Sequence, residues 1–170
     1  MKKFPVAILL LAFAVVIYSC GSSSDKTESA TEEKASVTKS TITPVVNVSA
    51  IAGKSPEEVE AILGKAESTE KASPGGTPCK ENPCDKSFYQ AEKFEVIFIN
   101  GKADWITVNN LSDHELNENN IALLGLSPST PAFSNPNIIR WENVDGIKQV
   151  SFLSNGAGKI DYADVKVATK

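Results

Sequence analysis

Alternation of apolar and polar residues marks a β-hairpin near the middle of the chain. In the segment FEVIFINGKADWITV, Asn100 and Gly101 suit a two-residue type I′ turn, so we expect paired strands over 94–99 and 102–108. This turn places Val96 opposite Trp105 and predicts two apolar faces, one with Phe94, Val96, Phe98 and Trp105 and the other with Ile97, Ile99, Ile106 and Val108. A hairpin that is apolar on both faces is expected to lie centrally in its sheet, covered on each side.

A second segment, IKQVSFLSNGAGKIDYADVKV, repeats this plan. Val150 and Phe152 alternate with polar residues, a glycine-rich turn follows at 155–158, and the chain returns through Ile160 and Tyr162. We also expect one strand before each hairpin, around 87–91 and 138–142. Each unit of the chain is therefore predicted to contain three strands.

Helix signals precede each group of strands. Ser55 and Glu58 have the spacing of a capping box, with Gly64 closing the helix. Ser112 and Glu115 repeat that spacing ahead of Gly125, and AILGKAEST from 61 resembles ALLGLSPST from 122. The predicted fold class is α+β: tandem units of a helix plus a three-stranded antiparallel sheet over 49–109 and 110–170, packed as one domain. The alternative is a chance similarity between two short helix and hairpin units.

The chain begins with a pattern typical of exported proteins. Two lysines precede an apolar run over 4–18, which is shorter than the roughly 20 residues of a membrane-spanning helix. Ile17, Ser19 and Cys20 resemble a bacterial lipobox, which implies a signal peptide over 1–19, lipidation of Cys20 and a lipid anchor in the membrane. The resemblance to lipoproteins also implies the outer membrane, because Gly21 stands where an aspartate retains such proteins at the inner membrane. The alternative is an ordinary secreted protein with an unrelated cysteine.

Composition separates a tether from a globular domain. Serine, threonine and charged residues dominate 20–44, so we expect a flexible tether there and a folded domain over 45–170. The chain has 17 basic and 21 acidic residues, and loss of Lys2 and Lys3 with the signal peptide changes the net charge from −4 to −6. An acidic balance argues against a nucleic-acid partner, because that binding depends on basic side chains neutralising phosphates.

Two cysteines remain once Cys20 carries lipid. Cys79 and Cys84 are expected to form a disulfide in an oxidising envelope, with a redox pair or metal ligands as alternatives. The bridge closes a ring inside a long loop over 65–86, which either binds a partner or is simply stabilised by the disulfide.

Little in the chain indicates catalysis. The single histidine, His114, lies in a predicted capping turn, and neither the pair Asp161 and Asp164 nor the pair Glu57 and Glu58 has the spacing of a calcium loop. We therefore expect no catalytic residue, metal or cofactor. Aromatic residues are the candidates for an interface, although most such residues in strands belong to a core. The candidate interface residues are Phe88, Tyr89, Trp105, Trp141 and Tyr162.

The segment IAGKSPEEVEAILGKAE, with FINGKADWI further on, resembles the BamE (SmpA/OmlA) family of small lipoproteins in outer-membrane assembly. It also resembles the related β-lactamase inhibitor protein, built from tandem helix and sheet units. This resemblance covers about residues 49–108 and implies a protein-binding module instead of an enzyme.

Three functions follow as hypotheses. The first is a lipid-anchored envelope protein that presents a sheet face or the loop over 65–86 to another envelope protein, as a scaffold in outer-membrane assembly or as an inhibitor. The second is a periplasmic solute-binding protein or an envelope enzyme with a pocket between the two units. The third is a lipoprotein that supports an envelope layer without a specific ligand.

Overall fold

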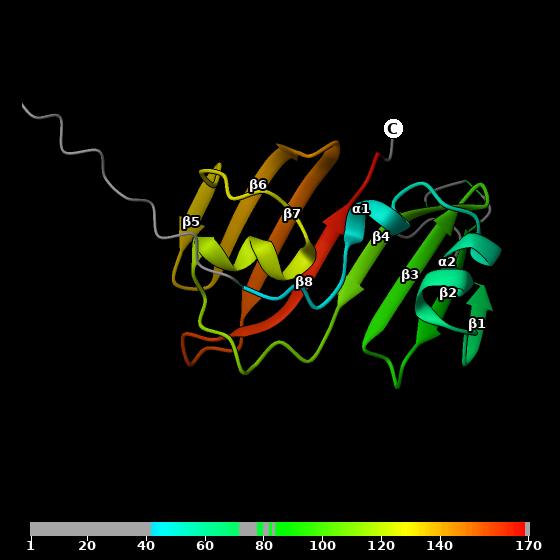
Figure 1. Cartoon of the computed structure of the whole chain (residues 1–170), viewed down its shortest axis with the longest axis horizontal. Helices are drawn as coiled ribbons and strands as arrows, with labels where there is room; N and C mark the ends of the chain where they lie inside the picture. The colour runs from blue at the N-terminus through cyan, green and yellow to red at the C-terminus, as the bar shows by residue number, and fades with distance from the viewer. Residues whose placement is uncertain (1–41, 72–77, 80–81, 83, 169–170) are drawn as a thin grey trace, which may run out of the picture. The chain divides into compact units, whose positions relative to one another are not determined.

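The computed structural model describes residues 42–71, 78–79, 82 and 84–168 (Figure 1). The predicted signal peptide, Cys20 and nearly all of the tether lie outside these residues. No helix in the described ranges has the length and apolar character needed to cross a membrane. The helical elements are α1 (Val48–Ile51), α2 (Pro56–Leu63) and the 3₁₀ helix η1 (Glu118–Leu124). The strands are β1 (Ser68–Lys71), β2 (Cys84–Tyr89), β3 (Phe94–Ile99), β4 (Lys102–Val108), β5 (Phe133–Asn135), β6 (Ile138–Val144), β7 (Ile147–Ser154) and β8 (Ile160–Lys166).

In the described part of the chain, all eight strands form one antiparallel sheet in the order β1-β2-β3-β4-β8-β7-β6-β5. Each half of the sequence forms a meander, and the two meanders join through their last strands. Pairing at this joint runs from Trp105 opposite Lys166 to Val108 opposite Ala163. The strand hydrogen bonds are therefore continuous across the joint.

The predicted fold class is wrong. Tandem units of a helix and a three-stranded sheet in a BamE-like α+β arrangement were expected, whereas the structure is mostly one extended antiparallel sheet with a few short helices. Two strands were missed because their sequences lack an apolar face: all four residues of β1 and all three of β5 are exposed. Backbone pairing at the edges of the sheet therefore adds strands that apolar periodicity does not reveal.

Figure 1 shows α1, α2 and η1 over one face of the sheet, and the hydrophobic core lies between them. Val48, Val59 and Leu123 from the helical elements join strand residues such as Val96 and Phe152 in one cluster. That cluster spans both meanders, so both halves share a single core.

The first helix prediction is confirmed. Ser55 is the N-cap of α2: its Oγ accepts a hydrogen bond from the Glu58 backbone N–H at 3.4 Å. The Ser55 backbone N–H in turn donates to Glu58 Oε2 at 2.9 Å, completing the capping box. Gly64 ends the helix with a φ of 90°, a backbone conformation that glycine adopts without steric cost.

The second helix begins later than predicted. Ser112 is not its cap; η1 starts after Asn117, whose side chain accepts a hydrogen bond from the Asn119 N–H. The chain before it pairs with the turn between β7 and β8, because the Leu116 N–H donates to the Gly158 carbonyl at 2.8 Å and the Ile160 N–H donates to the His114 carbonyl at 3.0 Å. This pairing uses backbone groups that an earlier helical turn would need.

The hairpin of β3 and β4 is confirmed at its turn, where Asn100 and Gly101 have φ values of 52° and 73°. Its predicted register is wrong beyond the first pairs. A bulge shifts the pairing so that Trp105 lies opposite Ile97 and Ile106 opposite Val96. One extra residue moves every later side chain of β4 to the other face.

Candidate binding face of the sheet

The face of the sheet opposite the helices, called the open face below, has side chains that alternate with the core residues. Strand register places these side chains in rows that cross the joint between the two meanders. Six of these side chains are half-buried, and none of the six belongs to the main core cluster. They are Phe88, Ile97, Trp105, Arg140, Tyr162 and Lys166.

The five predicted interface residues divide between the two faces. Phe88, Trp105 and Tyr162 lie on the open face, whereas Tyr89 and Trp141 are fully buried and cannot contact a partner. Burial of these two follows from strand alternation, since both lie on the face covered by helices.

Trp141 in particular has a core role. Its ring meets the Phe152 ring edge to face, with 5.4 Å between centroids, and its Nε1–H donates to the Ser129 carbonyl at 2.9 Å. Both contacts are typical of a buried tryptophan that packs its ring and satisfies its single donor.

Lysines lie over aromatic rings on the open face. Lys86 Nζ is 4.7 Å from the centre of the Phe88 ring, and Lys166 Nζ is 5.2 Å from the centre of the Trp105 ring. Both distances fall within the range of cation–π attraction. Lys86 also forms an ion pair with Glu95. Sequence reasoning missed these charged residues because their alignment depends on the register between strands.

The joint between the meanders carries a hollow of about 170 Å³ on the open face. Trp105 from β4, Arg140 from β6, Ser151 from β7 and Lys166 from β8 contribute to its lining. Arg140 Nε–H donates to Ser151 Oγ at 3.4 Å, and Gln149 Nε2–H donates to the same oxygen at 3.3 Å. Ile138 and Leu153 add apolar side chains to its lining.

Asp164 supplies the hollow with a carboxylate. Burial raises its pKa above the ordinary value, and the negative charge of Glu95 adds to that effect. A hydrogen bond from Thr107 Oγ1 to Asp164 Oδ1 at 3.0 Å opposes the shift without cancelling it. Burial likewise raises the pKa of Tyr162, with Asp164 and Asp161 adding repulsion. Ionisation of Asp164 or Tyr162 is therefore less favourable on this face than in water.

The pKa of Glu95 is shifted in the opposite direction from that of Asp164. Burial acts to raise its pKa, but hydrogen bonds from Lys86 and Asn109 and the charge of Lys86 outweigh burial and hold the pKa below its ordinary value. The Glu95 carboxylate is therefore stabilised in its charged form by the neighbours that the sheet register brings to it.

The structure contains a disulfide between Cys79 and Cys84, with Cα atoms 5.7 Å apart. Both cysteines are buried and pack with Ile99 and Ile97 in a small cluster beside the main core. Ile97 is on the open face, so the bridge anchors the chain entering β2 at one end of that face. Of the loop over 65–86, residues 72–77, 80–81 and 83 lie outside the described residues.

The remaining candidates for chemistry do not gather into a site. Across 42–71, 78–79, 82 and 84–168, no group of three or more His, Cys, Asp or Glu side chains is placed to hold a metal ion. His114 lies on the chain that pairs with the turn between β7 and β8, and Glu57 and Glu58 lie in the first turn of α2.

Comparison of the chain with protein-family models, curated proteins and solved structures finds no match.

Proposed function

We propose that this protein is a lipid-anchored protein of the cell envelope that binds another envelope protein through the open face of its sheet. One observation carries the proposal: half-buried aromatic, aliphatic and charged side chains share the face that the helices leave uncovered. Aromatic and arginine side chains are enriched among the residues that dominate binding energy at protein interfaces.

The lipid anchor is the second part of the proposal. It is supported by the sequence, in which a short apolar run follows two lysines and ends at Ile17, Ser19 and Cys20. Gly21 supports the outer membrane as the location. More than one acyl chain on this cysteine would make attachment stable, since each buried methylene contributes about 0.8 kcal/mol.

The hollow does not favour the solute-binding or enzyme hypothesis. Its volume of about 170 Å³ is below the roughly 300 to 1,000 Å³ of typical small-molecule sites, whereas a second pocket of about 340 Å³, lined in part by Asn100, Asp104 and Val167, lies within that range. A protein surface with a shallow hollow suits one protruding side chain of a partner better than an enclosed metabolite.

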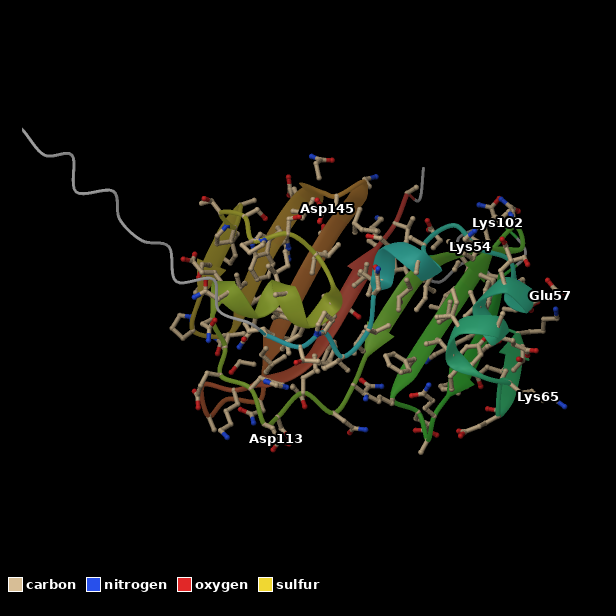
Figure 2. The ribbon with its side chains drawn as sticks, viewed as in Figure 1. Lys54, Glu57, Lys65, Lys102, Asp113 and Asp145 are labelled. Carbon is tan, nitrogen blue, oxygen red and sulfur yellow. A yellow bond between two sulfur atoms is a disulfide. The ribbon has the colours of Figure 1, made fainter. Side chains whose placement is uncertain are left out.

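Site-specific photocrosslinking in intact cells tests the proposal. A benzophenone amino acid at Tyr162, on the open face, is compared with the same group at Lys65, which is exposed between α2 and β1 (Figure 2). We expect a discrete crosslinked envelope protein from position 162 and none from position 65. Equal products from both positions, or none from 162, would contradict binding through the open face.

Anchoring is tested separately. Cys20→Ser is expected to remove fatty-acid labelling and release the protein from the membrane fraction. Labelling of the variant equal to that of the wild type would contradict lipidation at this cysteine.

A further inference from the structure

The hollow at the joint of the two meanders has two cations but no ion pair among the described residues. Arg140 Nε–H bonds only to the neutral Ser151 hydroxyl, and Lys166 lies over the Trp105 ring. Neither cation lies within ion-pair distance of a described carboxylate; Asp164, in the same hollow, accepts its hydrogen bond from Thr107 instead.

The other meander offers a direct comparison on the same face. There Lys86 lies over Phe88 much as Lys166 lies over Trp105, but Lys86 is paired with Glu95. Glu95 therefore neutralises the cation of one meander, and no described residue does so in the other. A half-buried cation without an anion attracts one, because charge-assisted hydrogen bonds are stronger where water is partly excluded.

We propose that this hollow binds a Glu or Asp side chain of the partner protein, with its carboxylate held by Arg140 and Lys166. This inference rests on the proposed function and specifies the chemistry of the partner for the same face. Arg140 presents a planar set of donors suited to a carboxylate, and Lys166 supplies a second charge. Trp105 and Leu153 provide apolar contact for the residues that flank the acidic one.

The charge pattern favours a protein carboxylate over a lipid phosphate. The open face carries Glu95 and Asp164 beside its cations, and the whole chain has a net charge of −4. An anionic bilayer presents many charges at once, so these carboxylates would oppose its approach to the face. A single acidic side chain can reach the two cations without meeting every carboxylate.

Substitution of Asp164 is expected to change carboxylate binding in the opposite direction from substitution of the two cations. Its carboxylate lines the same hollow, so a bound carboxylate is repelled by it when both are ionised. Asp164→Asn removes this repulsion and is therefore expected to strengthen binding, whereas Arg140→Gln and Lys166→Gln are expected to weaken it. A general loss of structure would not change binding in both directions.

The first test titrates the purified, lipidated full chain in nonionic detergent with an acetylated and amidated peptide of alternating threonine and glutamate. The indole N–H signal of Trp105 in NMR spectra reports binding, and the threonine–glutamine peptide is the control. We expect Arg140→Gln and Lys166→Gln each to weaken binding about tenfold, Lys65→Gln, at an exposed position between α2 and β1, to leave it unchanged and Asp164→Asn to strengthen it. Equal binding of both peptides, or of all variants, would overturn the inference.

The second test repeats the crosslink from position 162 in the same variants. Loss of the crosslinked product in Arg140→Gln and Lys166→Gln, with retention in Lys65→Gln, supports the inference. Retention in all of them overturns the carboxylate site while the proposed function stands. Absence of any product from the wild type counts against the proposed function, and the peptide titration still decides the inference.

Vesicles of phosphatidylcholine with and without phosphatidylglycerol decide between the two sources of negative charge. Binding to the anionic vesicles that is lost in Arg140→Gln, together with no binding of the glutamate peptide, would overturn the inference in favour of a lipid headgroup.

Discussion

Asp164 is a half-buried carboxylate whose charged form the fold does not favour. Its native pKa lies above the ordinary value, mainly through burial, so the native state takes up a proton first as the pH falls. This linkage contributes stability at low pH that is lost as the pH rises through the native pKa. Asp164→Asn should therefore stabilise the protein at neutral pH by on the order of 1 kcal/mol, since the Thr107 hydrogen bond retains an acceptor.

Urea denaturation of the wild type and Asp164→Asn between pH 4 and about pH 8 checks this expectation, with the gain shrinking as the pH falls. Asp161→Asn is the matched control, because Asp161 is an exposed residue of the same strand. A variant that is less stable than the wild type at neutral pH would show that the carboxylate is stabilising.

Glu95 should show the opposite dependence on pH. Its native pKa lies below the ordinary 4.5, so its contribution to stability is present above that value and lost as the pH falls through the lowered native pKa. Glu95→Gln is expected to destabilise the protein at pH 7 by about 0.5 to 1 kcal/mol, because the pair with Lys86 is lost. Urea denaturation over the same pH range measures this loss of stability. An equal loss at all pH values would rule out the charge of Glu95 as the cause.

Which residues form the open face could be predicted only in part from the sequence. Aromatic type identified Phe88, Trp105 and Tyr162, but also Tyr89 and Trp141, because residue type does not report which face a strand buries. Arg140 and Lys166 were missed for the same reason. Both come to the hollow through pairing between strands far apart in sequence.

At the scale of elements, the sequence predicted the helix cap and the hairpin turn that depend on residues close together in the chain. The capping box of α2 and the turn between β3 and β4 each depend on a few neighbouring residues, and both are confirmed. The start of η1 involves backbone pairing with Gly158 and Ile160, and Asp104, the extra residue of the bulge in β4, accepts hydrogen bonds from the Val167 and Ala168 N–H groups. Local signals at Ser112 and in β4 could not report that pairing.

Substitution of the helix caps tests this distinction. Ser55→Ala removes the cap of α2 and Asn117→Ala removes that of η1, and each should cost about 1 kcal/mol of stability. Ser112→Ala should cost much less, although its sequence pattern resembles that of Ser55. Thermal unfolding of the three variants provides the comparison. A loss of stability for Ser112→Ala equal to that for Ser55→Ala would mean that Ser112 caps a helix, which contradicts the fold described above.

At the scale of the whole molecule, the repeat in the sequence predicted two units but not how they join. Helix and hairpin patterns described each half, whereas β4 and β8 pair across the halves and turn two meanders into one sheet. No local pattern encodes such a contact, since it depends on which edges remain unpaired after each meander forms. The hollow lies at this joint, so the proposed carboxylate site was equally hidden from the sequence.

One sheet over one core has a consequence for unfolding. The core cluster contains residues of both meanders, so neither half can lose its packing without exposing the other. Trp105 and Trp141 lie in different meanders, and Trp105→Phe or Trp141→Phe leaves one tryptophan to report on a single half. In each variant, urea transitions followed by fluorescence and by far-ultraviolet circular dichroism should share one midpoint. Fluorescence that changes at a different urea concentration from the dichroism would mean that the halves unfold independently, in spite of the β4–β8 pairing.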